Sequence, residues 1–103
     1  MNYKDVTVVI PTLNEEKNIE KLVGLLKKTY KGIAVIVVDD GSTDHTQVVA
    51  KKAGAFVLDR SNEPLHGLCV SVLDGVHATK TLFVVVMDGD MQHPYEKVSE
   101  IVE

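Results

Sequence analysis

Hydrophobic residues gather in four short runs along the chain, and segments with helical spacing follow them. Each run is rich in valine or isoleucine and almost free of polar residues, which is typical of strands buried on both faces of a parallel sheet. The runs are Val6–Ile10, Ile33–Val38, Ala55–Leu58 and Leu82–Met87. Helices are predicted from about residue 14 to Gly32, from Ser42 to Gly54, over about 67–78 and from Pro94 onward.

Polar residues at the segment ends predict where the first two helices begin and end. Thr12 and Glu15 have the spacing of a capping box, and Asn14 is an alternative N-cap. Asp44 or Ser42 is expected to cap the second helix, which Gly54 would end.

The alternation of strands and helices predicts an α/β fold, a Rossmann-like three-layer sandwich with a mainly parallel sheet. We expect the strand order 3-2-1-4, with the second and fourth strands on either side of the first. In such sheets, ligands bind at the carboxyl ends of the strands, near the point where strand order reverses. Three acidic segments would meet there, at 11–15, 39–40 and 88–92.

Two carboxylates, Asp88 and Asp90, directly follow the last apolar run. Close carboxylates repel one another, and a divalent cation relieves that repulsion. With the Gln92 amide they offer oxygen ligands, which suit Mg²⁺ or Mn²⁺ better than zinc. A polar turn after a strand is the simpler alternative.

The second strand ends in Asp39 and Asp40. One of these carboxylates could accept hydrogen bonds from a ribose or a base, while at least one is expected to cap a helix or turn the chain. Arg60 and His66 are expected beside this edge, where they could meet a diphosphate, although solvation in a loop is the favoured account. No glycine-rich phosphate loop follows the first strand, so a diphosphate would depend on the metal.

Composition narrows the functional classes. The 103 residues suffice for one domain, and 45% are apolar. A net charge of −4 without a basic run argues against nucleic-acid binding. No apolar stretch reaches the roughly 18 residues of a membrane span. The single Cys69 excludes an intrachain disulfide, fits a cytoplasmic protein and is expected in the core.

Three motifs together resemble a known family. The segments "VVIPTLNEEKNI", "VIVVDDGSTDHT" and "VVVMDGDMQHP" are similar to the N-terminal half of family-two GT-A glycosyltransferases. The last form is most similar to the branch of dolichyl-phosphate mannose synthases and related polyprenyl-phosphate sugar transferases. The resemblance covers nearly the whole chain.

The resemblance implies a partial GT-A fold and assigns roles to several residues. Nucleotide-sugar contacts fall on Pro11, Leu13, Glu15, Val38, Asp40, Asp88, Gly89 and Asp90, and metal ligands on Asp88, Asp90 and Gln92. The implied donor is a nucleotide sugar such as GDP-mannose or UDP-glucose. The implied acceptor is a polyprenyl or dolichyl phosphate, and the anomeric centre inverts.

The chain departs from the family pattern in two places. Leu13 stands where an aromatic residue is frequent, and the segment from His66 to Ser71 replaces a lysine followed by "GLGxA". The acceptor-side half of the family would follow residue 103. Residues 1–103 are therefore expected to be a truncated, nucleotide-sugar-binding half that binds donor weakly and transfers little sugar alone.

Two other functional classes are considered. One is a non-catalytic nucleotide-binding half-domain, which only a turnover measurement distinguishes from a transferase. The other is a phospho-receiver module, but its acidic pair belongs on the first strand, whereas Asp39 and Asp40 follow the second. We also expect homo-oligomers through an exposed edge of the fourth strand, and a full-length protein at the cytoplasmic face of a membrane.

Overall fold

The computed structural model describes residues 3–87, and within them the predicted order of strands and helices is confirmed. The last predicted helix and the segment 88–92 lie outside the described residues. The elements are β1 Val6–Thr12, α1 Glu16–Thr29, β2 Ala34–Asp39, α2 Thr46–Ala53, β3 Phe56–Asp59, α3 Leu68–Ala78 and β4 Phe83–Val86.

The described strands form one parallel sheet in the order β3-β2-β1-β4, as predicted. β1 and β2 are central, which agrees with their long apolar runs. In their register Pro11 lies opposite Val38 and Thr12 opposite Asp39, so both strands end at the same edge of the sheet. β3 ends beside them, where Asp59 pairs with Asp39.

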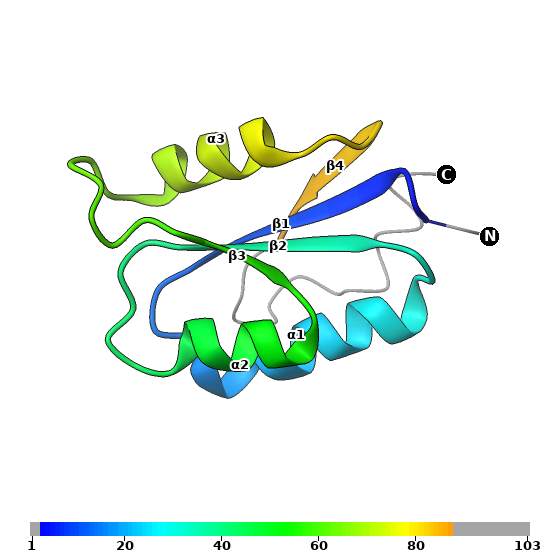
Figure 1. Ribbon diagram of the computed structural model, residues 1–103, viewed down its shortest axis with the longest axis horizontal. Coiled ribbons are helices and arrows are strands. Elements are labelled where there is room, and N and C mark those ends of the chain that lie inside the picture. The colour runs from blue at the N-terminus through cyan, green and yellow to red at the C-terminus, as the bar shows by residue number, and fades with distance from the viewer. Residues whose placement is uncertain (1–2, 88–103) are drawn as a thin grey trace.

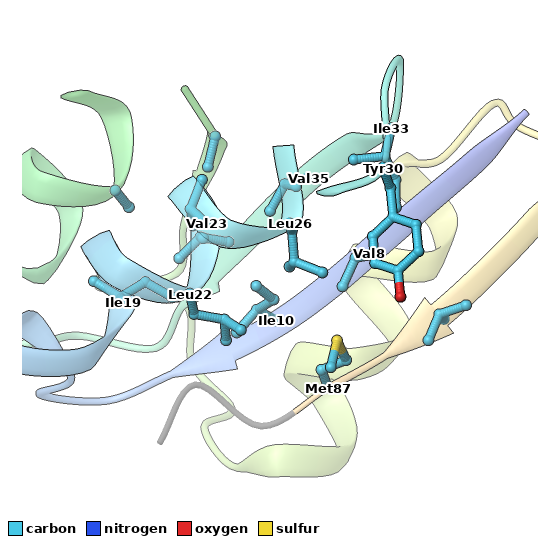
Figure 2. Packing of buried hydrophobic residues seen from close by; sticks show 14 of the residues in the cluster. Val8, Ile10, Ile19, Leu22, Val23, Leu26, Tyr30, Ile33, Val35 and Met87 are labelled. Atoms are coloured by element: carbon cyan, nitrogen blue, oxygen red, sulfur yellow. The ribbon is translucent and has the colours of Figure 1, made fainter. Parts of the chain in front are cut away.

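Helices cover both faces of the sheet and make three layers (Figure 1). α1 and α2 lie on one face, and α3 lies on the other (Figure 1). The larger core lies under α1, where the buried Ile19, Leu22, Val23 and Leu26 pack toward the sheet residues Val8, Ile10 and Val35 (Figure 2). Their helical spacing is the amphipathic pattern seen in the sequence.

A glycine lets α3 approach the sheet closely on the opposite face. A Cβ atom on Gly75 would lie 2.4 Å from Val9 Cγ1 and 2.8 Å from Val38 Cγ2. Both valines are fully buried. Only a residue without a side chain fits here, and this contact fixes the distance between the second half of α3 and the sheet at Val9 and Val38.

β1 extends two residues beyond the predicted end at Ile10 and includes Pro11. The backbone N–H and C=O groups of successive residues in a strand point in turn toward the two neighbouring strands. Val9 accepts from the Met87 N–H on the β4 side, whereas Thr12 accepts from the Asp40 N–H on the β2 side. The backbone nitrogen of Pro11 therefore faces the β4 side. The described pairing of β1 with β4 ends at Val9–Val86, so it does not use an N–H group at position 11, which proline lacks.

The predicted capping box is wrong. α1 begins at Glu16, and its N-cap is Glu15, whose side chain makes no capping hydrogen bond. The Thr12 hydroxyl instead donates to Asp39 Oδ1 at 2.8 Å. Asn14 is no cap either, because its φ of 57° places it in a left-handed turn before the helix.

The loop before α2 caps α1 from a distance. The Glu15 N–H donates to Thr46 Oγ1 at 2.9 Å, and the Glu16 N–H donates to Asp44 Oδ2 at 3.3 Å. Asp44 also accepts from the Thr46 N–H at 2.9 Å. The N-cap position of α2 is His45 rather than Asp44 or Ser42, while Gly54 ends this helix in the left-handed conformation as predicted.

Several apolar side chains remain exposed at the edges of the sheet. Phe83 and Val86 on β4 and Phe56 on β3 are among them, and Cys69 is also exposed, contrary to the expectation of a core residue. Among the described strands, β4 pairs only with β1. No helix within residues 3–87 is long and apolar enough to cross a membrane.

Candidate functional site

A hollow of about 240 Å³ opens where β1 and β2 end and α3 begins. We call it the edge hollow. Its lining residues come from three separate parts of the chain and are Pro11, Thr12, Leu13, Asp40, Gly67, Leu68 and Ser71. The edge hollow lies at the carboxyl end of the strands, as predicted for a ligand site in a parallel sheet.

The structure brings three of the predicted site residues together. Pro11, Leu13 and Asp40 line the edge hollow. Val38 is fully buried and packs with the core beneath α3, so its side chain does not reach the edge hollow. Glu15 lies outside it, and its carboxylate accepts a hydrogen bond of 3.4 Å from the Asn18 amide.

Asp39 holds the surrounding backbone in place. Its buried carboxylate accepts from the Thr12 hydroxyl, the Ser42 hydroxyl, the Ser42 N–H and the Gln47 amide, at 2.5–2.9 Å. These bonds tie the ends of β1 and β2 to the start of α2. The expectation that one member of the acidic pair serves the fold is therefore confirmed for Asp39.

Asp40 faces the edge hollow and is held by three donors. Its Oδ1 lies 2.6 Å from Arg60 Nη1 and 2.9 Å from His66 Nδ1, and its Oδ2 accepts from the Gly67 N–H at 2.6 Å. Burial alone would raise the pKa of Asp40, but these three contacts outweigh burial and lower it. The carboxylate is thus ionised at neutral pH, and Oδ2 keeps a free acceptor site.

Arg60 anchors the loop from 60 to 67, whose last residue, Gly67, lines the edge hollow. Its side chain is 5% exposed, so the expectation of a solvated loop arginine is wrong. The guanidinium donates to Asp74 of α3 at 2.6 Å, to Asp40 at 2.6 Å and to the Leu65 carbonyl at 2.9 Å. The Asp74 contact contributes most to the raised pKa of Arg60.

Sequence reasoning missed Ser71 as a lining residue. Its side chain is 1% exposed, and its hydroxyl has no hydrogen-bond partner among the described residues. A signal was present in the sequence, because Ser71 is the only hydroxyl between Leu68 and Leu73 in the first part of α3. The helical period alone does not say whether such a residue faces solvent, the sheet or a ligand.

The N-terminal end of α3 lies at the edge hollow. Its N-cap is Gly67, which has a φ of 126° and offers no side chain to cap the helix. The first N–H groups of a helix lack partners within the helix and favour negative charge. Because Arg60 is already paired with Asp40 and Asp74, it is these N–H groups that can receive an anionic group at this end of the edge hollow.

The predicted metal ligands Asp88, Asp90 and Gln92 lie outside the described residues. Within residues 3–87, no group of three or more potential metal-ligating side chains occurs. The Met87 N–H bonds to the Val9 carbonyl, and β4 runs parallel to β1. β4 therefore directs its carboxyl end toward the same edge of the sheet as the edge hollow.

Comparison with protein-family models gives a match over residues 7–103 to the family described as glycosyl transferase family 2. Among curated proteins, a dolichol-phosphate mannosyltransferase from Pyrococcus furiosus is 36% identical over 95% of this chain and 29% of its own length. A 4,4'-diaponeurosporenoate glycosyltransferase from Staphylococcus aureus is 45% identical over 87% of this chain and 25% of its own length.

Solved structures of glucosyl-3-phosphoglycerate synthase from Mycobacterium tuberculosis have the same fold. One, in complex with Mn²⁺, UDP and glucosyl-3-phosphoglycerate, matches 82% of this chain and 33% of its own with a TM-score of 0.72 and 31% identity. Another, in complex with Mg²⁺ and UDP, matches with the same TM-score and identity. The chain thus spans less than half the length of these relatives.

Proposed function

The chain belongs to glycosyl transferase family 2, and on this basis we propose that the edge hollow binds the nucleotide part of a nucleotide-sugar donor. The observation that carries the proposal is the edge hollow itself, where Pro11, Leu13 and Asp40 meet the N-terminal end of α3. The leucine and proline offer apolar contacts to a ring. Asp40 offers an ionised acceptor for a ribose hydroxyl or a base N–H.

The proposed donor is a nucleotide diphosphate sugar of the UDP-glucose or GDP-mannose type. The start of α3 would receive part of the diphosphate charge through its first N–H groups, because Arg60 is already paired with Asp40 and Asp74. The solved relatives in complex with UDP support a nucleotide as the kind of ligand that this fold binds. Glu15 and Val38 are each two positions in sequence from a residue that lines the edge hollow, Leu13 and Asp40, and they remain predicted contacts of the nucleotide sugar.

A divalent cation, Mg²⁺ or Mn²⁺, would complete the site. Asp88 and Asp90, with Gly89 between them, and Gln92 are the proposed holders, since β4 leads toward the edge hollow and the relatives were solved with these ions. When bound, such an ion neutralises diphosphate charge and favours departure of the nucleotide. The described residues bind and orient the nucleotide.

For the whole protein we propose inverting transfer of a hexose, mannose or glucose, to a polyprenyl or dolichyl phosphate. The similarity to the P. furiosus dolichol-phosphate mannosyltransferase supports this acceptor class. A lipid phosphate is already anionic at neutral pH and needs no general base to attack, unlike a sugar hydroxyl. The proposed place of action is the cytoplasmic face of a membrane.

Titration calorimetry with GDP and UDP tests the donor site. We expect binding that strengthens with Mn²⁺, because the cation relieves repulsion between the diphosphate and the two aspartates. Asp90→Ala should remove the effect of Mn²⁺. Glu20→Ala removes an exposed carboxylate on α1 and should leave binding unchanged. Equal affinity in EDTA and in Mn²⁺ would show that no metal bridges the nucleotide.

Self-association through β4 is a second proposal for the chain. The exposed side chains of Phe83 and Val86 support it, together with the outer edge of β4, which no other described strand covers. Light scattering of the wild type and of Val86→Lys tests it. A monomeric wild type at high concentration would show that β4 does not join copies.

A further inference from the structure

Ser71 is an anomaly within the described part of the fold. Ser71 lines the edge hollow, its hydroxyl is buried, and no described residue makes a hydrogen bond to it. Buried polar groups in proteins are nearly always paired, because an unpaired one destabilises the fold. A partner from outside the described residues would satisfy the hydroxyl.

The other residues that line the edge hollow limit what that partner can be. Leu13 and Leu68 also line the edge hollow, and their side chains are 56% and 63% exposed. Leucines this exposed at a concave site gain free energy when an apolar surface covers them. The occupant should therefore have apolar faces and at least one polar edge atom.

The size of the edge hollow narrows the choice further. Its volume of about 240 Å³ is smaller than the pockets of roughly 300–1,000 Å³ that enclose whole drug-sized ligands. It suits one ring of a larger ligand whose remainder lies outside. A planar nitrogen heterocycle has apolar faces for the leucines and polar edge atoms for a hydroxyl.

We propose that the Ser71 hydroxyl hydrogen-bonds the edge of the nucleobase and contributes to the choice among bases. This inference rests on the proposed donor site and names the group that would distinguish the bases. Asp40 offers only an acceptor, for a ribose hydroxyl or a base N–H, and the start of α3 receives negative charge. Ser71 is an uncharged donor and acceptor among the residues that line the edge hollow, and its hydroxyl, unlike that of Thr12, has no partner among the described residues, so it can discriminate between ring edges.

The proposal predicts opposite effects of one substitution on stability and on binding. Ser71→Ala removes an unpaired hydroxyl, so the melting temperature of the free protein should stay the same or rise by a few degrees. The same change should weaken binding of the preferred nucleoside diphosphate by about 2- to 10-fold, the range for one neutral hydrogen bond. A hydroxyl that serves only the fold would show the reverse pattern.

The experiment titrates ADP, CDP, GDP and UDP into the protein in Mn²⁺, with thermal unfolding followed by circular dichroism. Ser61→Ala is the matched control, because Ser61 is exposed and donates to Asp59 rather than lining the edge hollow. We expect Ser71→Ala to reduce the preference of the wild type for one base while Ser61→Ala keeps that preference.

Three results would overturn the inference while leaving the donor site intact. They are a wild type that binds all four nucleotides equally, an equal loss of affinity for all four in Ser71→Ala, and unchanged affinities in that variant. The last result would assign the hydroxyl to the fold or to a bound water. A wild type that binds none of the four would overturn the proposed donor site as well.

Discussion

The buried carboxylate of Asp39 offers a sharp test of how the site is held together. Its Oδ1 accepts from the Thr12 hydroxyl at 2.8 Å and from the Ser42 hydroxyl at 2.5 Å. Its Oδ2 accepts from the Ser42 N–H and the Gln47 amide, both at 2.9 Å. Asp39→Asn preserves the size of the side chain but removes the charge and replaces one oxygen with an NH₂ group.

The expected loss of stability depends on which of the two orientations the new asparagine amide adopts. If its NH₂ replaces Oδ2, it meets two N–H donors and both bonds are lost. If its NH₂ replaces Oδ1, the hydroxyls of Thr12 and Ser42 can accept from it, but their own protons lose an acceptor. Bonds to a charged group contribute about 1.5–3 kcal/mol each, and neutral bonds about 0.5–1.5.

With the NH₂ group in place of Oδ1, the more favourable orientation, each of the four hydrogen bonds therefore contributes about 1 kcal/mol less to stability. Bonds in one network are not additive, so we expect Asp39→Asn to lower the free energy of unfolding by about 2–4 kcal/mol. Small domains have a total of about 5–15 kcal/mol. The substitution should thus remove a large share of the stability.

Urea denaturation followed by circular dichroism measures this loss. Asp5→Asn makes the same chemical change at an exposed position and should alter stability by no more than about 0.5 kcal/mol. Thr12→Val should cost less in the Asp39→Asn background than in the wild type, because the two side chains share a bond. A loss below about 1 kcal/mol for Asp39→Asn would refute the reasoning.

Three further predictions concern the packing of α3, the binding of nucleotide and the pH dependence of stability. Gly75→Ala should lower the free energy of unfolding by about 1–3 kcal/mol in urea denaturation, because the new Cβ meets the sheet. Gly24→Ala, in open space on α1, should instead raise it by about 0.5–1 kcal/mol. Equal effects of the two substitutions would contradict the close packing of α3. Asp40→Asn should weaken nucleotide binding by about 1–3 kcal/mol in calorimetry, and unchanged affinity would assign Asp40 to the fold alone. Folding lowers the pKa values of Asp40, Asp44 and Asp59. These carboxylates therefore stabilise the folded state fully above the unfolded pKa of about 4, and this stabilisation is lost as the pH falls through the lowered pKa values. A urea midpoint that did not decrease below about pH 4 would contradict this prediction.

The sequence predicted the elements and their order because their signals are local. Long apolar runs mark the central strands, and the period of Ile19, Leu22, Val23 and Leu26 marks the buried face of α1. The strand order follows from general rules on crossover connections. These features need no knowledge of which distant side chains meet.

The polar contacts of the site were harder to predict because their partners are far apart in sequence. Thr12 had an acceptable local role as a cap, but the buried Asp39 carboxylate, 27 positions away, took its hydroxyl. Arg60 looked like a solvated loop residue until the fold placed Asp74 and Asp40 beside it. Pro11, Leu13 and Asp40 were identified through the motif, whereas Ser71 was noted only as the last residue of a segment that departs from the family pattern.

The cap that the α2 loop supplies to α1 has a consequence for the order of folding. The bonds from Asn14, Glu15 and Glu16 reach residues 28 to 31 positions away. The first turn of α1 therefore has no cap until β2 has paired with β1 and carried the α2 loop into place. As the chain leaves the ribosome, α1 emerges before the residues that complete it. Its amide protons at Glu15 and Glu16 should become protected against hydrogen exchange together with the start of α2, and later than those in the middle of the helix.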